Sequence, residues 1–145
     1  TITIDLILAE PDRWNAANIA KELSAVPGLE PLGQRAANLP SNDAVLATAL
    51  AKASVVMGLS ADRAITRQLP DARATFATAG DDPKLFVPSF EGGVGPLPAL
   101  AEAATGLGAV NWLPESDQVI RRVPLLIRAG GKLYPSLSLE KPGDD

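Results

Sequence analysis

The stretch GLGAVNWLPESDQVIRRVPLLIRAGG, residues 106–131, combines two apolar runs with an acidic turn between them. We expect residues 106–113 and residues 119–131 to form two strands that the turn joins as an antiparallel hairpin. Successive side chains of a strand point to opposite faces, so the adjacent Arg121 and Arg122 would lie on opposite sides. Whichever side is buried would then carry an arginine at the rim of the core.

The size and composition of the chain indicate one folded domain. Its 145 residues are 46% hydrophobic and 21% charged, which is ordinary for a globular protein with a sizeable core. A net charge of −4 without a long basic run excludes nucleic acid as an expected partner. No apolar run is long enough to span a bilayer, and no secretory signal stands at the start. Because the chain opens at Thr1 within an apolar strand pattern, we expect an excised piece of a longer protein.

The absence of two residue types excludes several kinds of chemistry. Without histidine, the chain cannot form a Ser-His-Asp triad or a histidine-ligated zinc site. Without cysteine, it cannot form a disulfide, a thiol nucleophile or a thiolate metal site. We therefore expect no catalytic residue of these kinds, no metal and no cofactor.

Apolar strands alternate with helical patterns in the N-terminal half. We expect a buried strand over residues 1–9, a helix over residues 17–26 and an irregular excursion over residues 29–40. A second helix is predicted to run to about residue 53, with Ser41, Asn42 and Asp43 as candidate N-caps, and a second buried strand is predicted over residues 54–60. Seven apolar residues are expected to face inward from the two helices: Ile19, Leu23, Val26, Val45, Leu46, Ala49 and Leu50.

The C-terminal half is more punctuated by glycine and proline. Residues 61–83 are ambiguous between helical turn and strand, and residues 85–90 are expected to form a short strand or an extended segment. The segment EGGVGP at residues 91–96 is predicted to be a glycine-rich loop, followed by a short helix over residues 97–105. YPSLSLE at residues 134–140 is expected to begin another helix.

Together these elements predict an α/β fold in which a central mixed β-sheet is flanked by helices as a layered sandwich. The predicted C-terminal hairpin completes that sheet, and the fold is expected to be truncated at its N-terminus. Residues 1–140 would form the domain, and residues 141–145 a soluble tail.

Two features upstream of the hairpin invite a functional interpretation. Gly93-Val94-Gly95 precedes a helix, but the following prolines lack the backbone donors that a phosphate-binding loop needs, so we expect a plain loop. Asp5 interrupts the first apolar strand, and Glu10 stands at its end. These carboxylates would either be paired with an internal arginine or donor, or take part in acid–base chemistry.

Asn111, Asp117, Arg121 and Arg122 form the strongest candidate cluster. A guanidinium at the edge of an apolar face is costly to desolvate unless it meets a carboxylate or an anionic ligand. Asp117 in the preceding turn is one possible partner, and Asp5 or Glu10 is another. The pattern leaves two alternatives open: an internal ion pair that holds the hairpin, or an arginine that faces an anion.

Several ordered motifs resemble the CHASE domains of the second type, a family of extracellular sensory domains attached to cyclases and histidine kinases. The family pattern pairs a G-x-G-x-x-N strand with an acidic turn, an R-R-V-P-L-L strand and a Y-P-S-L-x-L-E segment. Eleven C-terminal positions match that pattern: Gly106, Gly108, Asn111, Asp117, Arg121, Arg122, Pro124, Tyr134, Pro135, Ser136 and Glu140. Upstream, four positions match the family's F-D-x-x-F-x-E-P and D-x-x-L-A-x-A-L segments: Asp5, Glu10, Pro11 and Asp43.

The chain departs from the family pattern in two respects. Gln118 stands where the family has glycine after the turn aspartate, which predicts a looser loop than a tight Asp-Gly turn. The family also carries an earlier strand and helix before the position of Thr1. Because that strand would pair beside the first one here, we expect an open sheet edge unless something covers it.

The resemblance implies a non-catalytic sensor on the periplasmic or extracellular face of the bacterial inner membrane, in an integral membrane receptor that is a homodimer. It would sense an unidentified small ligand and control a cytoplasmic adenylate or guanylate cyclase or a histidine kinase, and the tail would lead towards a membrane span. The implied ligand-binding residues are Asp5, Glu10, Asn111, Asp117, Arg121 and Arg122. The alternatives are a structural dimerisation or protein-interaction module without a pocket, and an enzyme that uses the carboxylates of Asp5 and Glu10.

Overall fold

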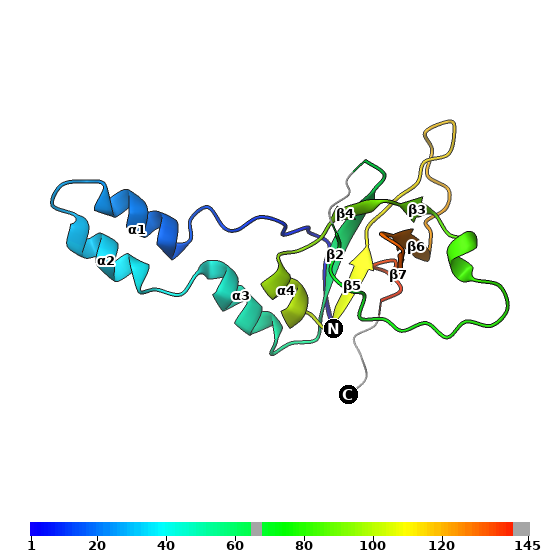
Figure 1. Ribbon diagram of the computed structural model, residues 1–145, viewed down its shortest axis with the longest axis horizontal. Helices are drawn as coiled ribbons and strands as arrows, with labels where there is room; N and C mark the ends of the chain where they lie inside the picture. The colour runs from blue at the N-terminus through cyan, green and yellow to red at the C-terminus, as the bar shows by residue number, and fades with distance from the viewer. Residues whose placement is uncertain (65–67, 141–145) are drawn as a thin grey trace.

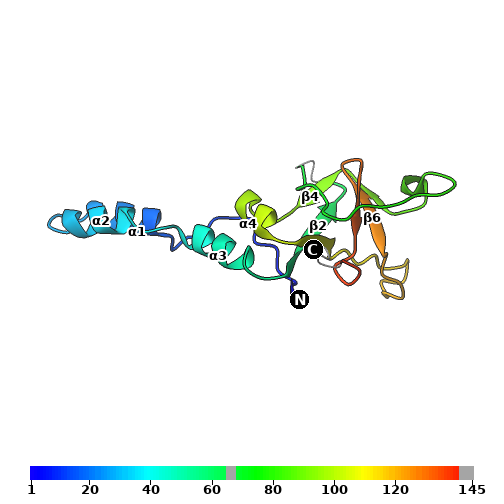
Figure 2. The ribbon, with the colours of Figure 1, turned by 90° about the horizontal axis from the view of Figure 1, so that it is seen from below.

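The computed structural model describes residues 1–64 and 68–140, so the predicted tail at residues 141–145 lies outside the described residues. Figure 1 shows a body of strands and two helices from which a pair of helices extends to one side. The pair consists of α1 (Ala16–Ser24) and α2 (Glu30–Ala37), and we call residues 13–39, which contain both helices, the helical arm. Figure 2 shows the same separation of arm and body from a perpendicular direction.

Strand β2 (Val55–Asp62) is the centre of the first sheet. It pairs in parallel with β1 (Ile2–Ile4) and β5 (Gly106–Ala109), and antiparallel with β4 (Gly92–Val94). Its apolar run VVMGL is almost completely shielded from solvent, as expected for a strand with neighbours on both edges. The predicted mixed sheet with flanking helices is therefore confirmed.

Two helices of the body cover one face of this sheet. Helix α3 (Asn42–Leu50) starts at Ser41, whose Oγ accepts a hydrogen bond from the backbone N–H of Ala44 at 3.1 Å. Helix α4 (Pro98–Ala103) begins with a proline in its first turn. Leu50 of α3 and Leu100 of α4 belong to one buried core cluster. Met57, Leu59 and Leu107 of the sheet belong to the same cluster.

A second sheet contains β3 (Ser89–Phe90), β6 (Leu126–Ala129) and β7 (Lys132–Pro135). Strands β6 and β7 form a hairpin across Gly130-Gly131, where both glycines have positive φ angles of 53° and 79°. Two consecutive residues with positive φ are typical of a tight hairpin turn, which explains the glycine pair. A parallel bridge between Ala109 and Ser136 joins the two sheets.

The predicted hairpin across the acidic turn is wrong. Strand β5 ends at Ala109 and β6 begins only at Leu126, so Arg121 and Arg122 lie on an irregular segment and the alternation argument does not apply to them. The apolar side chains of that segment remain exposed: Val119 47%, Ile120 42%, Val123 47% and Leu125 61%. They have no neighbouring strand to pack on, because β6 pairs with the later β7 and with β3.

The first strand is also shorter and more exposed than expected. Instead of a buried strand over residues 1–9, β1 covers Ile2–Ile4, with Ile2 56% and Leu6 64% exposed. Among the described strands β1 pairs with β2 alone and therefore lies at a sheet edge. One neighbour and one helical layer are too few to bury both faces of this segment.

Three segments expected to be loop or helix adopt other structures. Residues 29–40 contain α2 rather than an irregular excursion, because the buried positions of this helix are the small Gly33 and Ala36, which an apolar periodicity does not detect. EGGVGP supplies strand β4, and YPSLSLE supplies the end of β7 and a single turn instead of a helix start. Between residues 68 and 83 the structure has no strand, and a 3₁₀ turn follows at Pro83–Leu85.

The inward faces predicted for the two amphipathic helices are partly wrong. Leu50 is buried as expected, but Val45 is 54%, Val26 47% and Ile19 38% exposed. In α1 the buried residues are Ala16 and Ala20. The large apolar residues of the arm thus lie on its surface, while alanines and a glycine lie between its helices.

Glycines of β5 allow the C-terminal turn to lie directly on the sheet face opposite α3 and α4. A Cβ added at Gly108 would be 2.5 Å from Cα of Leu137 and 2.8 Å from its backbone N. At Gly106 the nearest atoms are Cγ and Oε1 of the Glu140 side chain, at 2.8 and 2.9 Å. The first contact is with backbone, which cannot move aside without breaking the junction of the two sheets.

We predict that Gly108→Ala destabilises the protein by about 1–3 kcal/mol, because the added methyl group overpacks against the backbone of Leu137. Gly106→Ala is the matched control and should cost no more than about 1 kcal/mol, since a flexible glutamate side chain can rotate away. Urea unfolding followed by circular dichroism measures both. Equal losses for the two variants would contradict the backbone contact.

Candidate ligand-binding site

A cavity of about 420 Å³ lies on the sheet face opposite α3 and α4. Thr3 pairs in register with Val56, and Val56 with Gly106, so these residues share the face that the C-terminal turn covers. Ten residues from β1, the end of β5, the following segment and the C-terminal turn line it: Thr3, Asp5, Ala109, Val110, Trp112, Val123, Ser136, Leu137, Ser138 and Glu140. Both ends of the described chain thus meet at one hollow.

The polar part of this cavity consists of carboxylates and hydroxyls. Ser136 is buried, and its Oγ lies 3.0 Å from Oγ of Ser138. Burial raises the pKa of Glu140 above its ordinary value, and the backbone of Leu107 offsets this in part. Asp5 adds a second carboxylate from the other side. No lysine or arginine belongs to the lining, so the cavity is acidic.

Asn111 lies outside this cavity and has a structural role. Its Oδ1 accepts a hydrogen bond from the backbone N–H of Ala61 at 2.8 Å, and its Nδ2 donates to the carbonyl of Ala61 at 2.7 Å. These two bonds continue the pairing of β2 beyond the end of β5. The side-chain amide therefore replaces a backbone partner.

Arg121 pairs with the acidic turn that precedes it. Its Nη1 and Nη2 donate to the two carboxylate oxygens of Asp117 at 2.9 and 2.7 Å, and Nη1 also donates to Oε2 of Glu115 at 3.2 Å. The Arg121 guanidinium holds the pKa of Asp117 below its ordinary value, with a further contribution from the backbone N–H of Val119. Of the two alternatives for this arginine, the internal ion pair is confirmed.

The turn itself is tight rather than loose. Gln118 donates its backbone N–H to the carbonyl of Glu115 at 2.9 Å, and Glu115 donates to the carbonyl of Val119 at 3.1 Å. Gln118 has a φ of 64°, the left-handed conformation that glycine adopts without strain. The expected loosening is wrong because the Arg121–Asp117 pair and these backbone bonds hold glutamine in an unfavourable conformation.

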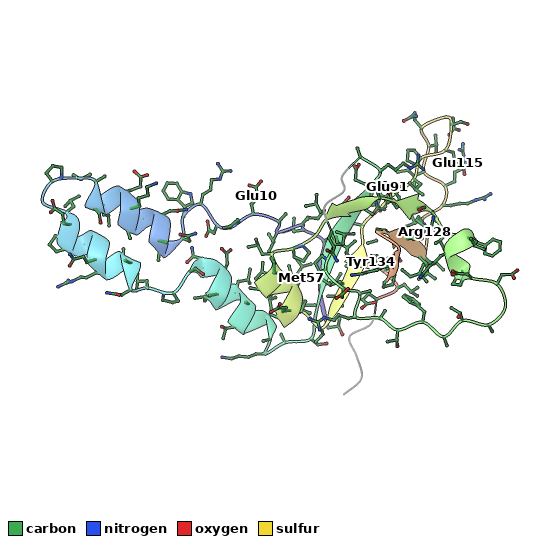
Figure 3. The ribbon with its side chains drawn as sticks, in the orientation of Figure 1. Glu10, Met57, Glu91, Glu115, Arg128 and Tyr134 are labelled. Carbon is green, nitrogen blue, oxygen red and sulfur yellow. The ribbon has the colours of Figure 1, made fainter. Side chains whose placement is uncertain are left out.

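The remaining predicted site residues lie apart. Figure 3 shows Glu10 on the segment between β1 and α1, away from the strands, while Asp5 lines the cavity. Arg122 is exposed and has no hydrogen bond or ion pair among the residues that the structure describes. The structure thus brings together Asp117 and Arg121 but not the six residues as one site, and their binding of a ligand stays a prediction.

A family motif on the helical side also has a structural role. The backbone N–H of Asp12 donates to Oδ2 of Asp43 at 3.2 Å, and Oδ2 of Asp12 accepts from Nδ2 of Asn42 at 2.7 Å. The bond from Asn42, with one from the backbone N–H of Trp14, lowers the pKa of Asp12. This network ties the connector after β1 to the start of α3.

Sequence reasoning missed Trp112 and Ser138, and it treated Ser136 and Glu140 only as motif matches. A usable signal existed, because glycines two residues apart in a buried strand require something to approach that face closely. The approaching segment follows Tyr134 and lies 26 or more residues further along the chain. Neither the glycine motif nor the segment after Tyr134 indicates that the other is its partner, so only the tertiary structure shows the contact.

A second cavity, of about 570 Å³, is lined by residues around the start of α4 and the segment after residue 68. Two charged side chains of its lining, those of Asp71 and Arg73, already have protein partners. Nη2 of Arg73 donates to the carbonyls of Ala101 and Glu102 at 3.2 and 3.0 Å, and Lys132 forms an ion pair with Asp71. These groups stabilise the end of α4 and the second sheet, so the acidic cavity is the better candidate.

Within residues 1–64 and 68–140 no group of three or more acidic, histidine or cysteine side chains is placed to hold a metal ion. Over the same residues, no helix has the length and apolarity that crossing a membrane requires.

Comparison with known proteins yields one family. The model of the CHASE2 domain family matches residues 1–142, nearly the whole chain. No curated protein and no solved structure matches the chain significantly.

We predict that Gln118→Gly stabilises the protein by about 0.5–1 kcal/mol, since glycine removes the cost of a left-handed backbone but adds entropy to the unfolded chain. The same substitution at Gln34, an exposed position within α2, should destabilise by about 0.5 kcal/mol through lower helix propensity. Urea unfolding of both variants checks the pair. Destabilisation at position 118 would show that the turn does not need the left-handed conformation.

We predict that Glu140→Gln changes how stability depends on pH. The folded-state pKa of Glu140 is raised, so its stabilising contribution is fully present below the unfolded-state pKa and is lost as pH rises through the folded-state pKa. The glutamine variant does not suffer this loss. Its advantage over the wild type in urea unfolding should therefore grow as the pH rises above about 4, the pKa of an ordinary glutamate. A difference independent of pH would rule out a desolvated carboxylate.

Proposed function

The chain belongs to the CHASE2 domain family, a family of extracellular sensory domains of signalling receptors. From this premise we propose that it senses a small ligand on the periplasmic or extracellular side of a bacterial membrane. The receptor would be an integral membrane protein with a cytoplasmic cyclase or histidine kinase as its output. In this role the domain itself catalyses no reaction.

The observation that carries the proposal is the acidic cavity at the meeting point of β1 and the C-terminal turn. Glu140 is kept there at a desolvation cost, which a protein without a use for the charge would avoid with an uncharged side chain. Asp5 faces the same space. A carboxylate that is partly desolvated gains most from a ligand with a positive charge.

The rest of the lining favours an organic cation over an inorganic one. Val110, Trp112, Val123 and Leu137 supply apolar surface, and Trp112 supplies an aromatic ring for a cation–π contact. Three hydroxyl groups, those of Thr3, Ser136 and Ser138, provide hydrogen-bond partners. We therefore propose a small amine with an apolar or hydroxylated body as the ligand class.

The position of the cavity supports a signalling role. Thr3 and Asp5 line it from the N-terminal strand, and Glu140 from the last described turn. A ligand that contacts both sides would change how these two ends of the domain sit against each other. A binding-induced shift between such arrangements is the kind of population change that a receptor can transmit.

The alternative of a protein-interaction module is favoured by a different observation. Arg121 is hydrogen-bonded to internal carboxylates, and large apolar side chains are exposed on the helical arm, among them Trp14 at 79% and Leu39 at 63%. Exposed apolar patches mark interaction surfaces in soluble domains. The two functions use different parts of the molecule and can coexist.

We predict that a small primary or quaternary amine raises the melting temperature of the wild-type domain. At a concentration of about 100 times the dissociation constant, binding contributes about 2.7 kcal/mol, or a shift of about 5–10 °C for a domain of this size. Thermal unfolding with a panel of amines and matched carboxylic acids measures it. Asp5→Asn should abolish most of the shift.

Glu10→Gln is the matched control, since it neutralises a carboxylate of the same N-terminal segment outside the cavity. It should leave the shift unchanged. Arg122→Ala tests the earlier hypothesis of an anion-facing arginine. Stabilisation by the carboxylic acids that this variant loses would favour the arginine over the cavity, and amine stabilisation that survives Asp5→Asn would exclude Asp5 as a contact.

A further inference from the structure

The buried residues of the two arm helices are all small. The buried residues are Ala16 and Ala20 on α1 and Gly33 and Ala36 on α2. A Cβ added at Gly33 would lie 2.1 Å from Oγ of Ser24 and 2.9 Å from the carbonyl oxygen of Ala20, so the backbones approach closely. This interface leaves no room for a large side chain and buries little apolar surface.

The large apolar residues of the arm are directed outward instead. Exposed fractions are 79% for Trp14, 38% for Ile19, 47% for Val26, 49% for Leu32 and 63% for Leu39. No residue of α1 or α2 belongs to the core cluster of the body. Figures 1 and 2 show why, since the arm extends away from the strands in both views. Helices of nine and eight residues are marginal in water without a packed apolar face.

One outward surface of α1 has a defined shape and charge pattern. Six residues line a hollow of about 760 Å³, which we call the arm surface: Arg13, Trp14, Asn18, Ile19, Glu22 and Leu23. In sequence order Arg13 comes first, before α1 begins, and Glu22 lies in the last turn of α1. Trp14 and Ile19 lie between these two charges along the chain, and Leu23 follows Glu22. Asn18 is near the middle, five residues after the arginine and four before the glutamate.

This pattern is complementary to itself. A two-fold axis through the region of Asn18 would bring a second copy of α1 antiparallel to the first. Arg13 would then face Glu22 of the second copy, and Glu22 would face its Arg13, while Trp14 and its apolar neighbours pack in the centre. A partner without this reversed charge order would leave at least one charge unpaired at the rim.

We propose that the arm surface binds the arm surface of a second copy of this chain, with the two α1 helices antiparallel. The resulting interface would cover the apolar side chains that the arm cannot bury against its own body. It would also couple two sensory domains in one receptor. The inference does not depend on the ligand cavity, so each can fail without the other.

Sedimentation equilibrium of the 145-residue chain over a range of concentrations tests the association. The wild type should form dimers that dissociate on dilution, and Trp14→Ala should raise the dissociation constant at least about tenfold. Phe86→Ala is the matched control, because Phe86 is an aromatic residue of the body with a similar exposure of 73%. Circular dichroism confirms that each variant is folded.

Charge reversal tests the antiparallel geometry. Arg13→Glu or Glu22→Arg alone places like charges together at both ends of the interface and should weaken the dimer at least about tenfold. The double variant restores both pairs with reversed sign and should recover most of the wild-type affinity. If Arg13 and Glu22 only stabilised α1 within one chain, the double variant would not restore the dimer mass in sedimentation equilibrium.

A single cysteine gives a direct measure of the axis, because the chain has none of its own. Asn18→Cys should form a disulfide-linked dimer under mild oxidation, whereas Asn38→Cys at the end of α2 should remain largely monomeric. A wild-type chain that stays monomeric up to about 1 mM would overturn the proposal. So would a double reversal that fails to restore dimers, or equal cross-linking at the two cysteine positions.

Discussion

The close contact between the C-terminal turn and the glycine face of β5 is the constraint on which the rest of the body depends. Leu137 donates its backbone N–H to the carbonyl of Ala109 at 2.8 Å, and the bridge from Ala109 to Ser136 joins the two sheets. Only glycine at position 108 leaves space for this backbone. Tyr134, next to this contact, lies in the core, and its hydroxyl donates to the carbonyl of Pro70 at 2.8 Å. Burial raises the pKa of the Tyr134 hydroxyl to about 12.

The same contact creates the candidate site. By bringing the last described turn onto the sheet, it makes Glu140 part of the same cavity lining as Asp5 and four apolar side chains, those of Val110, Trp112, Val123 and Leu137. Several residues that mark the family are connectors in this arrangement: Asn111 extends the pairing of β2, and Asp117 orders the turn through Arg121. The positions that match the family pattern therefore include connectors that hold the domain together as well as three residues of the cavity lining: Asp5, Ser136 and Glu140.

The body and the arm differ in which apolar side chains they bury. In the body, large side chains such as Met57 and Leu100 fill one core between sheet and helices. In the arm, small residues let two short helices approach closely, and the large side chains are left on the outside. An exposed apolar surface of this kind is stabilised when another protein surface covers it. The order of Arg13 and Glu22 along the arm surface is the basis for our proposal that a second copy of the chain covers it. The proposed ligand site and the proposed interface thus lie in separate regions of one chain.

Local signals in the sequence determined three elements of this protein: the buried strand β2, the capped helix α3 and helix α4, which begins with a proline. They also determined the ion pair between Asp117 and Arg121, which are four residues apart. Each rests on residues near one another along the chain, where periodicity, capping and reach are decided by neighbours. Only the tertiary structure decided that β6 pairs with β7, that β1 is an exposed edge and that Glu140 and Asp5 line the same cavity. Those outcomes depend on which of several distant segments pairs with a given strand edge or packs on a given sheet face. A pattern of neighbouring residues does not contain that information.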